Sequence, residues 1–461
     1  MEDLRLPHPD ARLLAAFRRA ASDLPWYRTL LSEQGVHPGD VNDTATFSAR
    51  CPALTKQNTF DRFPIAQLCA TTPLTDLGTV LTSSGHGGRF SFGLSTRAQD
   101  RAGADAIDEA LDATCGVRSI PTLAINCLPM GVGFSSQCMT MATTSVREDM
   151  AVALIDAFGS GYEQIVLVAD PLFVKRLTDH ARERGLDWGR HRLHVVIGEE
   201  VFGEHFRGYL AAAFGFDLGQ PAHGYLMSSF GVGELGLHLC YETPATIALR
   251  RASCADAAVA ADLLGPGRAT SGMPMLFAFN PLRTFVEVDQ PDADGYGRLT
   301  ISMLDPTLPI PLLRYQTGDV VRLLDRDRVS ELLARHRVEL PGELPEHLLA
   351  LVGREREALP NGSHVSVYKD ALYANHAVAQ TLTGAVRVEA AGTACTLHVQ
   401  LGRGHEAGAG FEAAIRGAIP ADAQPAGVVS WPYHTFPYGM TLDYERKFTY
   451  YVAPQAPRRH A

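Results

Sequence analysis

Lysine is the scarcest charged residue in this chain of 461 residues. Only four of the 41 basic residues are lysines, so the other 37 are arginines; the lysines are Lys56, Lys175, Lys369 and Lys447. Because arginine serves at almost every cationic position, a retained lysine indicates a place that needs a compact ammonium group rather than a planar guanidinium.

The sequence also lacks long hydrophobic runs. No apolar stretch approaches the ~20 residues that a membrane helix requires. The first residues, Met1 to Pro7, are polar and do not resemble the apolar core of a signal peptide. We therefore expect a cytoplasmic protein that does not contact a membrane.

Positive net charge is absent as well. The formal charge is −10, which disfavours a broad nucleic-acid surface but leaves a local anion pocket open. No cysteine pair has CxxC or zinc-ligand spacing. The eight cysteines fit buried, reduced thiols; they are Cys51, Cys69, Cys115, Cys127, Cys138, Cys240, Cys254 and Cys395.

The length suggests about two to four domains. Two helices are expected near the start, at Ala11–Ala21 and Trp26–Gln34. Strands and helices then alternate from about residue 76, which favours an α/β sheet with parallel crossovers. The expected strands are Thr79–Thr82, Thr122–Cys127, Gln164–Val168 and Arg192–Ile197. The expected helices are Thr96–Cys115, Met139–Phe158, Pro171–Gly185 and Gly203–Phe214.

After about residue 245 we expect the run of helices to stop and a β-rich segment to follow. Its expected strands are Thr284–Val288, Arg298–Leu304 and Val320–Leu324, with short helices at Ser330–His336 and Glu346–Leu351. The last stretch of about 110 residues mixes strands with one amphipathic helix, which is typical of a small α+β unit. Its strands are expected at Val386–Glu389, Thr396–Gln400 and Val428–Trp431, and its helix at Gly410–Ala418.

A glycine-rich turn, residues 83–89, follows the first expected strand. It reads Ser-Ser-Gly-His-Gly-Gly-Arg. Such a turn can direct backbone N–H groups at phosphate oxygens, and Arg89 can add charge-assisted hydrogen bonds. The sequence is not a Walker loop, because its GK[ST] ending is missing. A plain turn remains the alternative.

Two later segments each contain one carboxylate beside glycine. Residues 229–236 contain Glu234, which can bind Mg²⁺ next to a nucleotide phosphate. Residues 311–319 end in Asp319, which follows a glycine turn and can accept hydrogen bonds from two ribose hydroxyls. A solvated glutamate and an ordinary turn aspartate are the alternatives.

Two short motifs complete the set. Gly353 and Arg354 open the last stretch, and Lys447 stands within Asp-Tyr-Glu-Arg-Lys-Phe at residues 443–448. A surface lysine is the alternative reading of Lys447.

The order and spacing of these motifs resemble the adenylate-forming superfamily of acyl-CoA synthetases, peptide-synthetase adenylation domains and luciferases, and within it the phenylacetate–CoA ligase-like branch. Arg314 to Asp319, Arg-Tyr-Gln-Thr-Gly-Asp, is close to that branch's Arg-Tyr-Arg-Thr-Gly-Asp. The other matching segments are residues 25–36, 54–56, 83–89, 198–199, 230–234 and 353–354.

The resemblance implies an α/β fold with two parts. A large N-terminal adenylate-forming domain, residues 1–352, would contain α/β sheets and a β-rich subdomain. A small mobile α+β domain, residues 353–461, would contain Lys447 and rotate about a hinge at Glu357.

The resemblance also implies ATP, Mg²⁺ and, as the probable second substrate, CoA. A carboxylic acid, aryl or small, would attack the α-phosphorus of ATP, and a thiol would then displace AMP. Lys447 would be catalytic, and Glu234 would be catalytic and bind Mg²⁺. The phosphate-binding residues would be Ser83, Ser84, Gly85, Gly88 and Arg89. The nucleotide-binding residues would be Gly198, Glu199, Phe230, Gly231, Asp319 and Arg354.

The acid pocket is expected between the sheet and the segment 224–233. Its expected lining residues are Met130, Gly131, Phe134, His223, Gly224 and Tyr225.

Several positions differ from the family pattern, including His86, Gly87, Phe230 and Gly233. A catalytically impaired nucleotide-binding relative therefore stays open. The sequence does not show the acceptor, so a carrier-protein thiol or an amine stays open beside CoA. A homodimer stays open too. The identity of the acid does not follow from the sequence.

Overall fold

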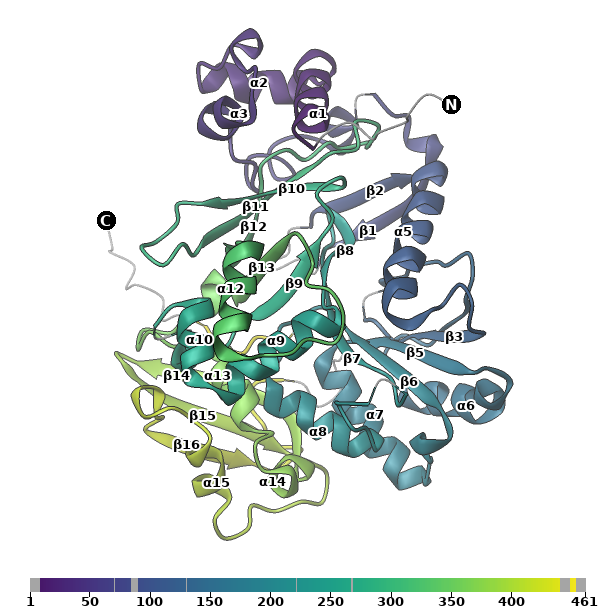
Figure 1. The fold of residues 1–461 in the computed structure, drawn as a ribbon, viewed down its shortest axis with the longest axis vertical. Coiled ribbons are helices and arrows are strands. Elements are labelled where there is room, and N and C mark those ends of the chain that lie inside the picture. Colours follow the sequence, from purple (N-terminus) through teal and green to yellow (C-terminus); the bar gives the residue numbers. More distant parts are fainter. Residues whose placement is uncertain are drawn as a thin grey trace.

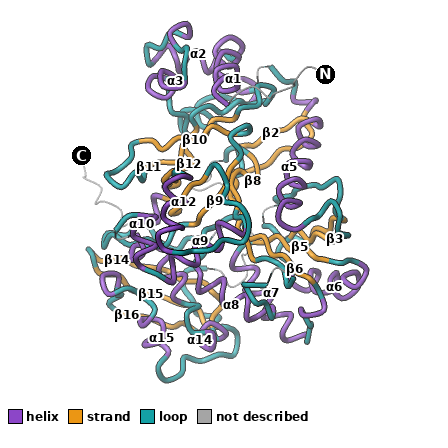
Figure 2. The backbone as a smooth tube through the Cα atoms, in the orientation of Figure 1, coloured by secondary structure: helices purple, strands orange, loops and turns teal. Residues whose placement is uncertain are grey.

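The computed structural model describes residues 9–69, 71–83, 90–129, 131–220, 222–266, 268–439 and 448–452. The N-terminal helices lie at one end of the molecule and a small sheet lies at the other (Figure 1). The strands of a large sheet run between them, with helices on both sides (Figure 2).

The large sheet has 11 strands in the order β10-β11-β12-β13-β9-β8-β7-β6-β5-β3-β4. Neighbouring strands from β4 to β7 are parallel, and those from β7 to β10 are antiparallel. The strands are β3 (Thr122–Asn126), β4 (Thr140–Thr143), β5 (Gln164–Ala169), β6 (Arg192–Ile197), β7 (Leu226–Val232), β8 (Gly236–Tyr241), β9 (Met275–Phe279), β10 (Thr284–Asp289), β11 (Gly297–Met303), β12 (Tyr315–Leu324) and β13 (Leu348–Arg354).

Helices connect β4 to β5, β5 to β6 and β6 to β7, since parallel strands need a crossover connection. They are α6 (Glu148–Phe158), α7 (Pro171–Arg184) and α8 (Glu204–Phe214), and α5 (Arg97–Cys115) precedes β3. The strands β3 and β5 are buried along their whole length, which explains their continuous apolar sequence. The ends of α5 follow from local chemistry: Thr96 and Gln99 form a capping box, and Gly116 closes the helix with φ 65°.

Four helices accompany the antiparallel half. They are α9 (Pro244–Ala255), α10 (Ala257–Leu264), α11 (Arg268–Ser271) and α12 (Arg326–His336). Leu249, Leu263 and Leu332 pack into one hydrophobic cluster with strand residues such as Leu276 and Leu348. These helices therefore cover one face of the antiparallel strands.

The first helices form an end cap on the sheet. They are α1 (Pro9–Asp23), α2 (Pro25–Glu33), α3 (Thr44–Arg50) and α4 (Ile65–Leu68), and a hairpin of β1 (Leu77–Thr82) and β2 (Phe92–Thr96) follows. Phe17 packs edge-on against Tyr27 and Phe47, at centroid distances of 6.3 and 5.7 Å. Leu54 then exchanges backbone hydrogen bonds with residues 314 and 316, so the segment after α3 is joined to β12.

The small sheet consists of β14 (Leu382–Ala391), β15 (Ala394–Leu401) and β16 (Gly427–Trp431) in that order. Its first pair is antiparallel and its second pair is parallel. The helices α13 (Val365–Ala371), α14 (His376–Gln380) and α15 (Phe411–Gly417) belong to the same unit.

A buried charge network lies behind the middle of the large sheet. Arg207 on α8 bonds Glu242, with Nη2 2.6 Å from Oε1, and neither side chain is exposed. Glu242 also accepts the N–H of Ser228 at 2.7 Å. Arg207 and Arg250 share Glu204. These buried charges are paired and hydrogen-bonded, as burial requires.

The small unit contacts the large body through Asp370 on α13. Gly203, the residue before α8, has no side chain to cap the helix. Asp370 takes that role, because its Oδ1 accepts the N–H of Phe206 at 3.0 Å and its Oδ2 lies 3.2 Å from Nδ1 of His205. Tyr373 adds an aromatic contact with Phe206 at 4.6 Å.

The alternation of strands and helices up to residue 214 is confirmed, with one error. The segment Met139–Phe158 is not one helix: β4 occupies its start, and α6 begins only at Glu148. The amphipathic spacing of the later residues extended the prediction over a short strand at the edge of the sheet.

Two expectations for the middle of the chain are wrong. Helices do not stop near residue 245, since α9, α10 and α11 follow. The segment Glu346–Leu351 is not a helix, because residues 348–354 form the buried strand β13. Short apolar runs fit a buried strand and a buried helix equally well, and only the pairing partners decide between them.

The predicted small α+β unit at the end of the chain is confirmed. Pairing in the large sheet continues two residues past the expected boundary at 352/353, because Gly353 pairs with Val320 and Arg354 pairs with Asp319. The boundary itself stays a prediction. In the described part of the chain, no helix has the length and apolar character needed to cross a membrane.

Replacing Gly203 with alanine should destabilise the protein. A Cβ at this position would lie 1.9 Å from Cγ of Asp370, so the carboxylate would have to leave the end of α8. We expect a loss of about 1–3 kcal/mol in the free energy of unfolding, as for other overpacked contacts. Urea denaturation would measure it.

Gly208→Ala is the matched control, because Gly208 lies in the same helix and a Cβ there meets nothing within 4 Å. Alanine in a helix interior should stabilise by up to about 1 kcal/mol. Equal effects of the two substitutions would contradict the role assigned to Asp370.

Candidate functional site

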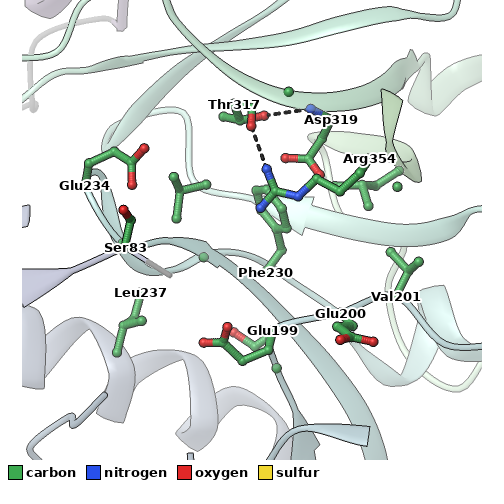
Figure 3. A pocket seen from close by; sticks show the side chains of 18 of the residues that line it. Ser83, Glu199, Glu200, Val201, Phe230, Glu234, Leu237, Thr317, Asp319 and Arg354 are labelled. Carbon is green, nitrogen blue, oxygen red and sulfur yellow. Dashed lines mark hydrogen bonds and ion pairs between the residues drawn. The ribbon is translucent and has the colours of Figure 1, made fainter. Parts of the chain in front are cut away.

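A cavity of about 570 Å³ lies where the two halves of the large sheet meet. Val168 and Gly198 line it from the carboxyl ends of β5 and β6, and Ser83 lines it from the end of β1. Open α/β sheets bind ligands at this edge. Figure 3 shows side chains from these segments converging with others from β7, β12 and β13.

The predicted phosphate loop begins at this cavity. The N–H of Ser83 donates to the carbonyl of Ser91 at 2.9 Å, and the N–H of Ser91 donates to Oγ of Ser83 at 3.0 Å. These two bonds join the residues that flank the loop. Of the predicted phosphate ligands, Ser84, Gly85, Gly88 and Arg89 lie outside the described residues.

Glu234 lies beside Ser83 (Figure 3). Tyr315 donates its hydroxyl hydrogen bond to Oε1 of Glu234 at 2.5 Å. Burial, followed by the nearby Glu234 charge, raises the pKa of Tyr315, so this phenol stays a donor at physiological pH. A Cβ on Gly93 would lie 2.0 Å from the carbonyl of Gly233, so glycine is needed there for β2 to contact the Glu234 loop.

Asp319 and Arg354 form an ion pair across the β12–β13 pairing, with Nε 3.3 Å from Oδ1. Arg354 also donates to the carbonyl of Thr317 at 2.6 Å (Figure 3). Asp319 is only 3% exposed, and its Oδ2 has no partner among the described residues. An unpartnered buried carboxylate oxygen is costly unless a ligand completes its hydrogen bonds.

Gly198, Glu199, Phe230 and Gly231 also line the cavity, so the structure brings these predicted nucleotide residues together. Glu199 has a left-handed backbone, with φ 71°, directly after β6. Phe230 lies on β7 with its ring 6.5 Å from that of Phe277. Asp319 does not follow a turn, as the sequence suggested, but lies within β12.

Only some of the residues expected in the acid pocket line the cavity. Phe134 lines the cavity, and so do its neighbours Leu128 and Val132. Gly131 is not among the lining residues, and Met130 lies outside the described residues.

His223, Gly224 and Tyr225 do not line the cavity, contrary to expectation. The carbonyl of His223 accepts a hydrogen bond from the N–H of Leu193, near the start of β6. Tyr225 stacks on His194, at 5.8 Å between centroids. The segment 223–225 therefore enters β7 at the amino end of the parallel strands, whereas the cavity lies at their carboxyl ends.

Two lysines to which the sequence analysis assigned no role line the cavity. Nζ of Lys56 lies 3.5 Å from Oγ of Ser83. Nζ of Lys369 lies 2.6 Å from Oε2 of Glu200 and 4.0 Å from the ring centre of Tyr450. The scarcity of lysine was the signal for both, although it was applied only to Lys447, which lies outside the described residues.

Glu200 links the two structural units at the cavity. The Tyr450 hydroxyl donates to Oε2 of Glu200 at 2.7 Å, beside the Lys369 contact. Glu357, the expected hinge residue, also lines the cavity, and burial raises the pKa of its carboxyl. Residues of the small unit thus complete one wall of the site.

The residues fit a nucleotide and a magnesium ion. The described residues contain no group of three or more His, Cys, Asp or Glu side chains suited to a metal. Mg²⁺ does not require such a group, because one or two carboxylates together with substrate phosphates hold it. Glu234, which lines the same cavity as Ser83, supplies such a carboxylate, and the unpartnered Oδ2 of Asp319 suits a ribose hydroxyl.

Solved structures show what this fold is similar to. The structure of 2-hydroxyisobutyryl-CoA ligase in the postadenylation state, in complex with R3-HIB-AMP, has a TM-score of 0.67 and 15% sequence identity over 96% of this chain and 88% of that chain. No family model and no curated protein sequence matches. The fold expected from the sequence, that of adenylate-forming enzymes, is confirmed.

The same ligase matches less well in other states. Its open conformation with 2-HIB-AMP and CoA gives a TM-score of 0.56, at 16% identity over 96% of this chain and 90% of that chain. Its thioesterification state gives 0.54, at 16% identity over 96% and 88%.

Asp170 provides a test of the electrostatics near the site. It caps α7 by accepting the N–H of Phe173, and burial, with the nearby carboxylates of Glu199 and Glu200, raises its pKa to about 7. The unfolded value is about 3.9. The folded state therefore binds this proton more tightly, and the stability it contributes is full below pH ~4 and lost as the pH rises through 7.

Asp170→Asn should remove this loss while keeping an equally good cap. We expect the variant to be more stable than the wild type at pH 8, with a gain that shrinks towards pH 4, in urea denaturation.

Asp43→Asn is the control, because Asp43 also caps a helix but a backbone hydrogen bond lowers its pKa. That variant should lose stability, relative to the wild type, as the pH rises. A pH-independent effect of Asp170→Asn would contradict the raised pKa.

Proposed function

We propose that this chain is an AMP-forming acid–thiol ligase. It activates a carboxylic acid with ATP to an acyl-adenylate, releases pyrophosphate, and transfers the acyl group to the thiol of CoA. The observation that carries the proposal is the buried Asp319–Arg354 pair with one unpartnered carboxylate oxygen, in the same cavity as Glu234 and the start of the phosphate loop.

In the first step, separate residues bind the ribose, the phosphates and the metal ion. Asp319 accepts hydrogen bonds from the ribose, and the ion pair with Arg354 orients that carboxylate. Ser83 and Lys56 line the end of the cavity assigned to the phosphates, and Ser84, Gly85, Gly88 and Arg89 are proposed to bind the phosphates with them. Glu234, which accepts a hydrogen bond from Tyr315, would hold Mg²⁺, and the metal would supply charge neutralisation on the phosphates.

The reaction itself is a displacement at phosphorus. A carboxylate oxygen of the acid attacks the α-phosphorus, and the bond to the bridging oxygen breaks, so pyrophosphate leaves with both electrons. Lys447 is proposed to contact the attacking carboxylate and the α-phosphate, where a compact ammonium can follow the charge that develops. The CoA thiolate then attacks the acyl carbon, and AMP leaves.

The second step is proposed to involve rotation of residues 353–461 about Glu357. The similar ligase has been captured in a postadenylation state, an open conformation and a thioesterification state. Rotation of this chain's small unit would separate Asp370 from α8 and Lys369 from Glu200. These contacts would therefore be specific to one state of the cycle.

The assignment to a phenylacetate–CoA ligase-like subtype rests on the motif resemblance. CoA is preferred to a carrier-protein thiol because the similar ligase was captured with CoA. The cytoplasmic location and the homodimer stay predictions.

Asp319→Asn should weaken MgATP binding about ten-fold or more, because it replaces a charged acceptor by a neutral one. Isothermal titration calorimetry would measure this dissociation constant, and thermal denaturation would confirm folding. Asp325→Asn is the control: Asp325 lies one residue past β12, caps α12 and does not line the cavity. Unchanged ATP affinity in the Asp319 variant would remove the ribose assignment.

Lys447→Ala should abolish pyrophosphate release while MgATP binding persists, because the lysine acts on charge that develops during the reaction. Lys447→Arg keeps the charge but not the compact shape and should remain strongly impaired. The measurement is pyrophosphate release with a panel of acids, with and without CoA. Near wild-type release by either variant would contradict the role of Lys447.

A further inference from the structure

One half of the cavity is apolar and is separate from the nucleotide residues. Leu111 of α5 and Leu128, Val132, Val168 and Val196 from the ends of the parallel strands line it and belong to one hydrophobic cluster. Gly198 marks its border, because a Cβ there would lie 3.6 Å from Leu128 and 3.9 Å from the carbonyl of Ser229. This half suits the hydrocarbon part of an acyl group.

Two polar side chains interrupt this apolar wall. Ser229 on β7 and His238 on β8 both line the cavity, and Oγ of Ser229 lies 2.9 Å from Nδ1 of His238. The other imidazole nitrogen, Nε2, is buried and has no partner among the described residues. Burial lowers the pKa of His238 to about 3, so the ring is neutral at physiological pH.

The backbone of His238 is strained and firmly held. Its φ is 55°, in the left-handed region that a non-glycine residue rarely adopts. Arg283 donates to the carbonyls of Leu237 and His238 at 3.0 and 2.9 Å. The imidazole stacks on Tyr241 at 4.7 Å, with 9° between the planes.

Glycine at position 231 allows this arrangement. A Cβ there would lie 3.0 Å from Cα of Leu237 and 3.3 Å from the N of His238. The two strands thus approach closely at the cavity wall, which sets Ser229 and His238 in a fixed relation.

These features are costly for folding. Left-handed backbone strain lowers the stability of the fold, and so does a buried nitrogen without a partner. Such costs concentrate where a side chain is set in place for a ligand. A serine and a neutral histidine in an apolar pocket offer hydrogen bonds but no charge.

No carboxylate is available in this half for a substrate ammonium, within the described part of the chain. Asp108 on α5 accepts hydrogen bonds from Ser136 and Gln137, both at 2.6 Å. Glu242 is paired with Arg207. The carboxylates that line the cavity lie on its nucleotide side or next to the small unit. They are Glu199, Glu200, Glu234, Asp319, Glu355 and Glu357.

We infer that Ser229 and His238 recognise the acyl group, and that the acid which this chain activates has a small or aryl hydrocarbon body with an uncharged hydroxyl substituent and no amino group. The inference rests on the proposed function and assigns its substrate class. Ser229 provides the contact, and His238 orients the serine hydroxyl through Nδ1.

The test compares acids that match in shape but differ in one group. The pairs are α-hydroxyisobutyrate with pivalate, β-hydroxybutyrate with isovalerate, and meta-hydroxybenzoate with meta-methylbenzoate; alanine and β-alanine represent amino acids. Pyrophosphate release is measured with the full chain and MgATP. We expect the wild type to prefer the hydroxy acid of at least one pair by about ten-fold or more in kcat/KM.

Ser229→Ala should reduce that preference to about three-fold or less. His238→Asn should do the same, because asparagine tolerates the left-handed backbone while the ring is lost. Ser253→Ala is the matched control, since Ser253 is a buried serine on α9 that does not line the cavity and bonds the carbonyl of Leu249. Its preference should equal that of the wild type.

The outcomes separate the inference from the proposed function. If no acid supports pyrophosphate release, the proposed function fails. Two results would leave the ligase function standing but overturn the assignment of Ser229 and His238. The first is pyrophosphate release only with methyl-substituted acids, unsubstituted acids or amino acids. The second is a Ser229→Ala variant that keeps the wild-type preference for the hydroxy acid.

Discussion

The buried network of Arg207, Glu242, Glu204 and Arg250 supports the region where the large sheet changes from parallel to antiparallel pairing. Glu242 bonds both Arg207 and the backbone N–H of Ser228 on β7. Arg250 donates to the carbonyls of Pro274 and Phe202, at 2.7 and 2.8 Å. A single network thus joins β7, α8, α9 and the entry to β9. Because every charge in it is paired, loss of one member would leave an uncompensated buried ion.

The site depends on that junction. The parallel strands end at the cavity with Val168 and Gly198, and the antiparallel strands bring Asp319 and Arg354 to the same place. β7 takes part in both halves, so it presents Ser229 and Phe230 between the apolar and the nucleotide half. The proposed activation of an acid by a nucleotide would require this adjacency, because the reacting carboxylate and the α-phosphate must be positioned together.

Local patterns were sufficient for much of the fold and some of the site. Periodicity identified β3, β5, β6, α5, α7 and α8, because these elements are long or strongly patterned. It could not separate the buried strand β13 from a helix, nor find β4. The motif residues Ser83, Glu234, Asp319 and Arg354 were named from their spacing, and the structure brings them to one cavity.

Only the tertiary structure could decide which side chains meet. His223, Gly224 and Tyr225 precede β7 in sequence and were expected in the acid pocket, but the parallel pairing with β6 places them at the opposite end of the strand. Lys56 and Lys369 lie more than 300 residues apart and line one cavity. The sequence by itself determined the residue chemistry and the motif order, because these depend on local spacing. Strand order and register determined the acid pocket, the Tyr315–Glu234 bond and the Ser229–His238 pair, because contacts between distant segments arise only from packing.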